Sequence, residues 1–356
     1  MKKVEKVNTC FLPTPLHKLE NVSKDLKDYN IYIKRDDMTG IGAGGNKLRK
    51  LDYIVHKAKA EGYTTLLTYG GVQTNHGRLT AAAAARFGMK SIIMCYGLPP
   101  KRISGNLLLD RIIGSEVVFM DTTEIRKEAE NMQYDEIVAA YKGLKKKATD
   151  SVTKRYEEQG EKVCIVEIGG HSKEGLLGYF DCVKEIQTQL KDQQIKMDYM
   201  VVGNGSGGTY GGLLLGAKYF DVDYEIWATN ISPKKEIEMD ELVDFCNKTS
   251  DYYDMGVEVK KEDLKYTNEY TGIAYNVPDK DTRETICYLA GKEGILVDPC
   301  YTGKAFRGLL GLIEEGKFKK GSNILFVHTG GVPGLWTEEH ETGFNEDLWN
   351  DVEVFK

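Results

Sequence analysis

Residues 63–97, "YTTLLTYGGVQTNHGRLTAAAAARFGMKSIIMCYG", contain two apolar runs separated by one helical pattern. The runs "YTTLLTYGG" (63–71) and "KSIIMCYG" (90–97) predict strands, and "NHGRLTAAAAARFG" (75–88) predicts a helix. Two continuous apolar strands joined by a helix are typical of a parallel sheet covered on both faces. This stretch therefore predicts an α/β fold.

The same alternation extends toward both ends of the chain. Further strands are predicted at "NIYIKRDD" (30–37), "KMDYMVVGNG" (196–205), "YEIWATNIS" (224–232), "ILVDP" (295–299) and "NILFVHTGG" (323–331). Further helices are predicted at 46–62, from near Thr209, at 283–294 and at 303–316. The charged, strand-poor stretch 120–160 predicts solvated helices near a boundary between two lobes.

The composition excludes several classes of function. A chain of 356 residues with a net charge of −6 has no general attraction for nucleic acid or an anionic membrane. No apolar run reaches the roughly 18–20 residues that span a bilayer, and "MKKVEKVNTC" lacks the apolar core of a signal peptide. Seven scattered cysteines without a CxxC pair argue against a disulfide framework or a zinc site. We therefore expect a cytoplasmic protein that acts on a small molecule.

Two glycine loops, "GIGAGG" (40–45) and "GNGSGG" (203–208), match the GxGxxG pattern of dinucleotide-binding proteins. That fingerprint also needs an acidic residue at the end of the next strand to bind the ribose. The next strands end in "TYGG" and "WATN", and neither supplies an acid. "GGNKL" also lacks the Ser or Thr of an ATP-binding P-loop, so a nucleotide cofactor is disfavoured at both loops.

The second loop nevertheless suits a phosphate. It follows an apolar strand directly and leads into a helix, so its backbone N–H groups and the hydroxyls of Ser206 and Thr209 can converge on one anion. The alternative is a tight turn that lets helix and strand pack closely. Four glycines, Gly205, Gly207, Gly208 and Gly211, are more than packing alone requires, which favours the phosphate.

Lys47 opens the helix that follows the first loop. In a helix from Asn46 to Ala60, it shares one face with four apolar residues, Leu51, Ile54, Val55 and Ala58. Five polar residues are expected on the opposite side: Arg49, Lys50, Asp52, His56 and Lys57. Burial and the helix dipole both lower the pKa of a lysine in this place, which suits it to form a Schiff base. The alternative is a lysine whose stem is packed and whose ammonium reaches water.

A Schiff-base lysine and a separate phosphate loop together suggest pyridoxal phosphate. "YGGVQTNHGR" places Thr74, Asn75 and His76 after a strand and at the start of a helix, where open α/β sheets bind ligands. Asn75 is a candidate to hydrogen-bond the phenolic oxygen of the cofactor, with a plain helix cap as the equal alternative. Thr329 of "HTGG" occupies a similar place after the last strong strand.

The chain resembles fold-type II pyridoxal-phosphate enzymes of the D-cysteine desulfhydrase and 1-aminocyclopropane-1-carboxylate (ACC) deaminase family. The motifs that carry the resemblance run from residue 12 to about 334 and are "LPTPLHKL", "IKRDD", "GGNKLRKL", "GGVQTNHGR", "GNGSGGTYGG", "YNVP", "GILVDPCYTGKA" and "HTGG". The resemblance implies a tryptophan synthase β-like fold with two open, twisted, mainly parallel sheets, and a homodimer. It divides the chain into a large cofactor-binding domain, 1–47 with 165–356, and a small domain, 48–164.

The resemblance also implies residue roles. Lys47 would form the Schiff base, and Asn75 would lie beside the phenolic oxygen. Residues 204–209 (Asn204, Gly205, Ser206, Gly207, Gly208 and Thr209) would surround the phosphate. Thr302 and Thr329 would lie near the pyridine nitrogen, and Tyr275 and Tyr301 would be active-site phenols. Thr74, Asn75 and His76, with the two tyrosines, would contact the substrate, and Thr74 would also take part in catalysis.

One position favours the desulfhydrase branch. ACC deaminases have a motif similar to "YEGK" where this chain has "YTGK". The resemblance therefore implies that Thr302 replaces a carboxylate near the pyridine nitrogen. A hydroxyl does not keep the ring protonated as an anion does, and simple elimination needs less carbanion stabilisation than cyclopropane opening. We therefore expect α,β-elimination, with D-cysteine giving pyruvate, sulfide and ammonia. Lys47 would remove the α-proton, and Tyr275 or Tyr301 would protonate the leaving group.

Three departures from the family pattern leave the substrate open. Thr74 replaces the serine of "QSNH", "GGHSKEG" places His171 and Lys173 where the family has "GGSN", and Cys300 replaces a small aliphatic residue. Lys173 could serve a more acidic substrate such as cysteate, or it could be a solvated loop lysine. The alternatives within the family are ACC deamination, a cysteate sulfo-lyase and another amino-acid ammonia-lyase. The alternatives of other classes are a nicotinamide oxidoreductase and a regulatory or carrier protein that binds pyridoxal phosphate.

Overall fold

The computed structural model describes residues 1–349, 353 and 355. The strands are β1 (Leu16–Lys18), β2 (Asn30–Arg35), β3 (Thr65–Gly70), β4 (Lys90–Tyr96), β5 (Glu116–Met120), β6 (Val163–Val166), β7 (Tyr199–Asn204), β8 (Glu225–Asn230), β9 (Lys265–Thr267) and β10 (Asn323–His328). The α-helices are α1 (Glu20–Leu26), α2 (Lys47–Ala60), α3 (Asn75–Arg86), α4 (Gly105–Ile113), α5 (Thr123–Glu128), α6 (Tyr134–Glu157), α7 (Lys173–Asp192), α8 (Gly208–Tyr219), α9 (Glu236–Tyr252), α10 (Lys280–Glu293), α11 (Thr302–Glu314) and α12 (Glu338–Leu348).

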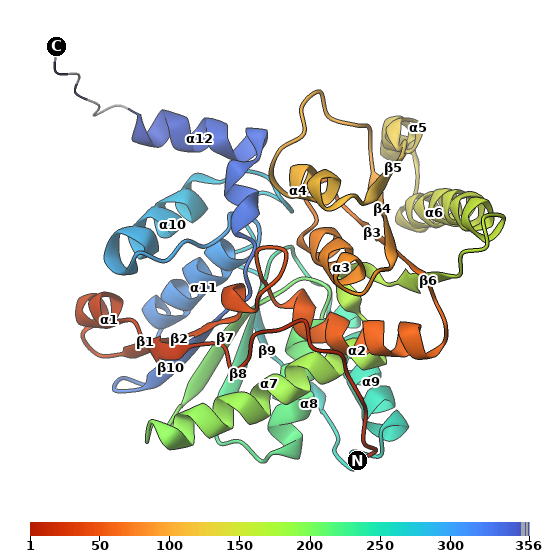
Figure 1. The fold of residues 1–356 in the computed structure, drawn as a ribbon. Helices are drawn as coiled ribbons and strands as arrows, with labels where there is room; N and C mark the ends of the chain where they lie inside the picture. The colour runs from red at the N-terminus through yellow and green to blue at the C-terminus, as the bar shows by residue number, and fades with distance from the viewer. Residues whose placement is uncertain (350–352, 354, 356) are drawn as a thin grey trace.

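The larger sheet has six strands in the order β1-β2-β10-β7-β8-β9, all parallel except β1. Side chains of its central strand β10 alternate between two cores, as the two-residue period of a strand requires. Leu325 and Val327 join the core of α7, α8 and α9, whereas Ile324 and Phe326 join the core of α1, α10 and α11. Helices therefore cover both faces of this sheet (Figure 1).

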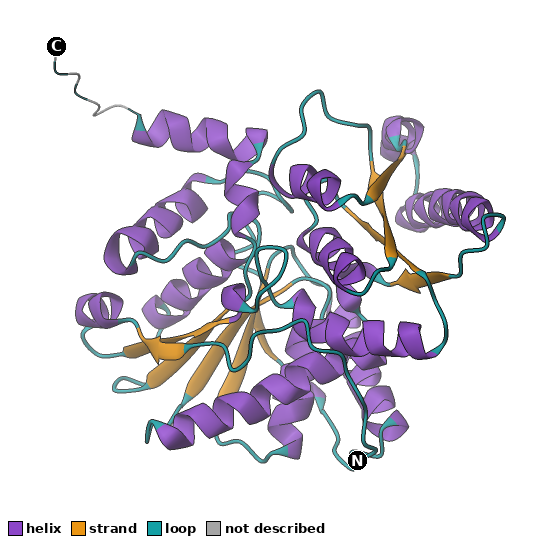
Figure 2. Cartoon of the chain, in the orientation of Figure 1, coloured by secondary structure: helices purple, strands orange, loops and turns teal. Residues whose placement is uncertain are grey.

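The smaller sheet has four parallel strands in the order β5-β4-β3-β6. The helix α6 packs on one face through Val152 and Tyr156, and α2 and α3 cover the other face. Figure 2 shows the strands gathered in these two separate groups. The predicted α/β fold with two mainly parallel sheets flanked by helices is confirmed.

One predicted strand is wrong. Residues 295–299, "ILVDP", pair with no strand among the residues that the structure describes and form a loop, buried except at Leu296, that leads into α11. Ile295 and Val297 are apolar because they fill the core under α11 rather than because they belong to the sheet. The Asp298 carboxylate accepts hydrogen bonds from the backbone N–H groups of Cys300, Tyr301 and Thr302 and so begins that helix.

The stretch 120–160 is helical, as predicted, but α6 covers the outer side of the small sheet (Figure 1). The division into domains 1–47 with 165–356 and 48–164 stays a prediction, and β6 crosses its boundary at 164/165. Within the described part of the chain, no helix combines the length and apolarity that a membrane span needs.

Candidate active site

A cavity of about 350 Å³ lies where the carboxyl ends of strands from both sheets meet. Open α/β sheets bind their ligands at such an edge, because helix N-termini and loops converge there. The segments after β3, β6, β7, β8 and β10 contribute to its wall, together with Tyr96, the last residue of β4. Its lining residues are Asn46, Lys47, Gly70, Gly71, Thr74, Asn75, His76, Tyr96, Ile168, Gly169, Gly203, Asn204, Gly205, Ser206, Gly207, Thr209, Ile231, Ser232, Lys234, Tyr275, Tyr301, Thr329 and Gly330.

Most of the predicted site residues meet in this cavity. Twelve of them are in its lining: Lys47, Thr74, Asn75, His76, Asn204, Gly205, Ser206, Gly207, Thr209, Tyr275, Tyr301 and Thr329. Gly208 and Thr302 are not among its described lining residues. The chain thus brings together side chains that are more than 250 positions apart in the sequence, between Lys47 and Thr329.

Lys47 is the first residue of α2, where the sequence predicts it. Burial lowers the pKa of its ammonium from 10.5 to about 8. At pH 7 roughly a tenth of such a lysine is neutral, compared with fewer than one molecule in about a thousand for an ordinary lysine. The amine is therefore prepared to attack an aldehyde.

The rate at which apoprotein attaches pyridoxal phosphate should rise with pH and level off near the Lys47 pKa of about 8. Only the neutral amine is nucleophilic, so the rate follows its fraction. Stopped-flow absorbance on mixing apoprotein with the cofactor measures this profile. A rate that keeps rising tenfold per pH unit up to about pH 10, as for an ordinary lysine, would contradict the lowered pKa.

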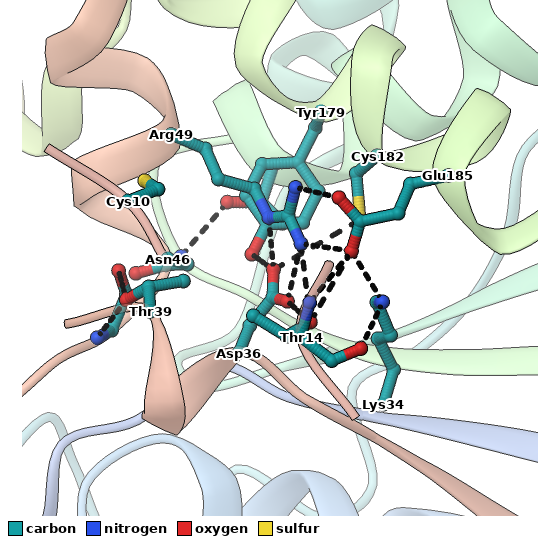
Figure 3. Close-up of polar contacts among 12 residues, drawn as sticks. Cys10, Thr14, Lys34, Asp36, Thr39, Asn46, Arg49, Tyr179, Cys182 and Glu185 are labelled. Carbon is teal, nitrogen blue, oxygen red and sulfur yellow. Dashed lines mark hydrogen bonds and ion pairs between the residues drawn. The ribbon is translucent and has the colours of Figure 1, made fainter. Parts of the chain in front are cut away.

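Three of the five polar residues of α2 do not face water, contrary to the sequence-based expectation, whereas His56 is partly buried and Lys57 is exposed. Arg49, Lys50 and Asp52 are all buried, because α2 packs against α7 on one side and α3 on the other. Figure 3 shows the guanidinium of Arg49 between the carboxylates of Asp36 and Glu185. Charge pairing, and not exposure, therefore accommodates Arg49.

Lys50 is a second buried amine beside the glycine loop, and the sequence-based reasoning missed it. Its Nζ donates to the carbonyl of Gly169 at 3.1 Å, and a Cβ built on Gly208 would lie 2.9 Å from that nitrogen. Burial and the neighbouring Lys47 hold its pKa well below the usual range. Three positions separate it from Lys47, a spacing that puts two residues on the same side of a helix and could have revealed it.

Thr209 is held by the residue that precedes Lys47. The side-chain Nδ2 of Asn46 donates to the Thr209 hydroxyl oxygen at 3.0 Å. The hydroxyl keeps its own proton for another acceptor. This bond joins the start of α2 to the glycine loop and leaves Thr209 able to donate into the cavity.

Asn204 presents a carbonyl oxygen. Its Nδ2 donates to Asn230 at 2.7 Å, and Asn230 in turn donates to the Oδ1 of Asn268, which accepts the backbone N–H of Lys234. The Asn204 Oδ1 is buried without a hydrogen-bond partner in the described part of the chain. Because a carbonyl oxygen repels a phosphate, this geometry argues against the predicted phosphate contact of this side chain.

The segment after β3 supplies three polar groups. The Thr74 hydroxyl accepts the backbone N–H of Gly77 at 3.2 Å and caps α3, so Thr74, and not Asn75, is the helix cap. Asn75 accepts a hydrogen bond from Asn106 at 2.9 Å through its Oδ1. His76 is buried, and burial keeps its pKa well below the usual range, so its imidazole is neutral at pH 7.

Tyr275 and Tyr301 form a pair in the cavity wall. Their hydroxyl oxygens lie 2.9 Å apart, and their rings meet edge to face at 5.8 Å. Burial raises the pKa of Tyr301, so its phenol keeps its proton at neutral pH. The buried Lys304 donates to the carbonyls of Thr271 and Ala274 and so holds the loop that carries Tyr275.

Thr302 is committed to its own helix terminus. Its hydroxyl donates to Asp298 Oδ1 at 2.6 Å and accepts the Asp298 backbone N–H at 2.8 Å. The Cys300 side chain is also buried, and burial raises the pKa of its thiol. Neither residue borders the cavity within the described chain, so a role near a pyridine nitrogen stays a prediction for Thr302.

His171 and Lys173 lie outside the cavity wall. The His171 ring stacks on Phe245 at 4.2 Å and borders a second cavity behind the glycine loop. The Lys173 ammonium lies 4.2 Å from the centre of the Tyr252 ring. This position does not support the hypothesis that Lys173 recognises an acidic substrate; Lys234 is the lysine that lines the cavity beside Lys47.

The residues present fit pyridoxal phosphate. Lys47 lines the cavity and the Lys50 amine lies beside its glycine loop, and neither forms an ion pair within the described residues. A phosphate held by the 205–209 loop, the Thr209 hydroxyl and Lys50 would supply the missing negative charge. Lys47, with its lowered pKa, supplies the neutral amine that reacts with an aldehyde. The residues present therefore suit both the phosphate and the aldehyde of the cofactor.

Comparisons with known proteins show which family the chain belongs to. The family model "Pyridoxal-phosphate dependent enzyme" matches residues 7–330. The chain is 33% identical over 334 residues to a putative 1-aminocyclopropane-1-carboxylate deaminase of Thermotoga maritima, covering 94% of this chain and 98% of the relative. It is 35% identical over 328 residues to a D-cysteine desulfhydrase of Yersinia enterocolitica, covering 91% and 92%.

A solved structure, described as an ACC deaminase homologue, superimposes with a TM-score of 0.80 at 32% identity and covers 98% of this chain and 96% of its own. The predicted cofactor and enzyme class are therefore confirmed at the level of the family. The chain belongs to the pyridoxal-phosphate dependent enzymes, among the relatives named ACC deaminase and D-cysteine desulfhydrase.

Proposed function

We propose that this enzyme catalyses α,β-elimination from a small amino acid, with D-cysteine and water giving pyruvate, hydrogen sulfide and ammonia. The observation that carries the proposal is a cavity that combines the low-pKa amine of Lys47 with two hydrogen-bonded phenols. An elimination needs one base to take the α-proton and one acid to protonate the leaving group. Both are present in the cavity wall.

The absence of a carboxylate supports elimination over ring opening. Among the described residues that line the cavity, none is Asp or Glu. Bound pyridoxal phosphate supplies an electron sink for the substrate Cα, and an anion beside its ring nitrogen makes that sink stronger. Elimination of a thiolate, which is a good leaving group, needs less stabilisation of negative charge at Cα than opening of a cyclopropane ring does. Asp298 does not serve as the anion beside the ring nitrogen, because its carboxylate oxygens already accept hydrogen bonds from backbone N–H groups at the start of α11.

The chain's own residues divide the remaining tasks. The Lys47 amine takes the proton from the substrate Cα. The Thr74 hydroxyl, which accepts from Gly77, still has a proton to donate to the substrate carboxylate. The neutral His76 adds a hydrogen-bonding group on the same side of the cavity. We assign protonation of the leaving β-substituent to the Tyr275–Tyr301 pair.

Replacing Tyr301 with phenylalanine should lower kcat while pyridoxal phosphate still binds. Loss of a general acid costs roughly 100-fold or more. We expect that full loss with serine, whose hydroxide leaves poorly, and a smaller loss with cysteine, whose thiolate leaves readily. Steady-state kinetics on both substrates measure the difference. Tyr275→Phe is the paired variant. If both variants and the double variant keep wild-type kcat with serine, the phenols are not the acid.

A second function, ACC deamination, is supported by the names of the Thermotoga maritima relative and of the superimposed structure. It would also release ammonia, but with a four-carbon keto acid and no sulfide. The two reactions thus differ in products that are measured directly.

The deciding experiment is a screen of the holoenzyme against D- and L-cysteine, cysteate, D- and L-serine, diamino acids and ACC. Keto acid, ammonia and sulfide are quantified for each. We expect the highest kcat/KM with D-cysteine and equal amounts of the three products. Keto acid from ACC at a higher kcat/KM would reject the desulfhydrase assignment, and no keto acid from any substrate would reject the lyase.

The proposal includes a homodimer in the cytoplasm. Both remain predictions from the family resemblance and the amino-acid sequence. Light scattering of the purified holoenzyme tests the dimer, and fractionation of cells tests the location.

A further inference from the structure

We infer that Asn106, on α4, is a positioning residue that makes Asn75 a hydrogen-bond donor toward the cofactor. The inference rests on the proposed function, in which Asn75 faces the phenolic oxygen of pyridoxal phosphate. Asn106 itself does not line the cavity within the described chain, whereas Asn75 does. The helices α3 and α4, which carry the interacting residues, pack against each other (Figure 1).

Two partners fix the orientation of the Asn106 carboxamide. Its Oδ1 accepts from the Arg78 Nε at 2.6 Å, and an arginine can only donate. Its Nδ2 donates to the backbone carbonyl of Gln73 at 3.0 Å, which can only accept. If the oxygen and nitrogen of this amide were exchanged, its NH2 group would face the Arg78 donor and its oxygen would face the Gln73 carbonyl. Neither pair could form a hydrogen bond. The amide therefore has one favourable orientation.

This orientation determines what Asn75 shows to the cavity. The Asn106 Nδ2 also donates to the Asn75 Oδ1 at 2.9 Å, so the oxygen of Asn75 is turned toward Asn106. The Nδ2 of Asn75 is then the group left for a ligand. An amide N–H stabilises an anionic phenolic oxygen, whereas an amide oxygen would repel it.

The hydrogen-bonded chain that runs from Arg78 through Asn106 to Asn75 also reaches the loop that precedes Lys47. Arg78 and Asn106 are both fully buried. The Arg78 guanidinium also donates to the backbone carbonyls of Gly42 and Gly44, in the loop that precedes Lys47. Arg78 thus connects the loop that precedes Lys47 to Asn106, whose amide orients Asn75.

The test is Asn106→Asp, which keeps the shape of the side chain and removes its only donor group. One carboxylate oxygen still accepts from Arg78, and the other faces Asn75. The amide of Asn75 then turns to donate to this introduced carboxylate, and its own oxygen faces the cavity. We expect the dissociation constant of pyridoxal phosphate, titrated by its visible absorbance, to rise about 10- to 100-fold.

A double-variant cycle distinguishes positioning from general damage. In an Asn75→Ala background the same Asn106→Asp change should alter the dissociation constant less than about twofold, because the group that it acts through is gone. Equal losses in both backgrounds, or no loss when Asn75 is present, would overturn the inference. Asn106→Ala, which frees Asn75 without reversing it, should give a smaller loss and covers the case in which the Asn106→Asp variant does not fold.

Asn247→Asp is the matched control. Asn247 also bonds one backbone N–H and one carbonyl, both of Val259, at 2.8 and 2.9 Å, but it lies outside the cavity wall. The Asn247→Asp variant should leave cofactor affinity within about twofold of wild type. A larger loss would mean that replacing any buried asparagine amide lowers cofactor affinity. Failure of wild-type protein to attach pyridoxal phosphate would reject the proposed function instead, so the two failures are distinguishable.

Discussion

Lys47→Ala should yield a folded, colourless protein that holds no covalently attached pyridoxal phosphate and has lost at least about a thousandfold in kcat. The substitution removes both the nucleophile for the cofactor aldehyde and the base for the substrate α-proton. Folding should survive, because alanine favours a helix and no buried ammonium has to be accommodated. Absorbance spectra, circular dichroism and keto-acid release measure the three properties.

Lys57→Ala is the matched control for this variant. Lys57 belongs to the same helix, but its side chain is 51% exposed and pairs with Glu174 at 2.7 Å. It should keep the colour, the fold and the activity. Retention of the visible band and of substantial activity by the Lys47→Ala variant would remove Lys47 from the centre of the mechanism.

Asp36→Asn should be the most destabilising polar substitution among the variants considered, lowering the free energy of unfolding by about 3–5 kcal/mol. The buried Asp36 carboxylate accepts from Arg49 at 2.7 and 2.8 Å, from Thr14 at 2.7 Å and from Tyr179 at 2.6 Å. Asparagine would leave the buried Arg49 with one carboxylate partner instead of two. The midpoint of thermal unfolding of the apoprotein should fall by several degrees.

The pH dependence of stability offers a second readout of the Asp36 substitution. Burial by itself raises the pKa of Asp36, but the Arg49 guanidinium, with smaller contributions from Lys34 and the Tyr179 hydroxyl, outweighs burial and brings the pKa to about 2. A depressed carboxyl pKa contributes stability above about pH 4, and this contribution is lost as the pH falls toward 2. The variant should therefore lose less stability than wild type over that interval.

Asp28→Asn serves as the control for the Asp36 variant. Its ion pair with Lys320 is exposed on both sides, so we expect a change within about 1 kcal/mol. Equal thermal midpoints for Asp36→Asn and Asp28→Asn would show that the buried network (Figure 3) does not stabilise the start of α2.

The buried face of α2 illustrates how far the amino-acid sequence leads. Helical spacing correctly places Leu51, Ile54 and Val55 on the face that packs on an apolar core, whereas Lys47, at the start of the helix, lines the cavity. The same pattern puts Arg49 and Lys50 in solvent, since it assumes that the opposite face meets water. The first half of α2 lies between two layers, so the charge of Arg49 is accommodated by a partner far along the chain, Glu185. Near the end of the helix Lys57 does meet water, as the pattern predicts.

Other errors have the same origin in long-range contacts. The apolar run "ILVDP" has the composition of a strand, but it joins no sheet in the described part of the chain, and its Ile295 and Val297 fill the core between the large sheet and the helices that cover it. Asn204 is correctly placed at the cavity, yet the direction of its amide depends on Asn230 and Asn268. The phenols Tyr275 and Tyr301 are indistinguishable by composition from other tyrosines and were predicted only through the family resemblance.

Borohydride reduction of the holoenzyme, followed by peptide mapping, tests the central claim most directly. Borohydride fixes the cofactor to the amine that holds it. We predict one pyridoxyl-labelled peptide, with the label on Lys47 and none on Lys50. A label on another lysine, or no label on yellow protein, would contradict the assignment of the low-pKa amine at the start of α2.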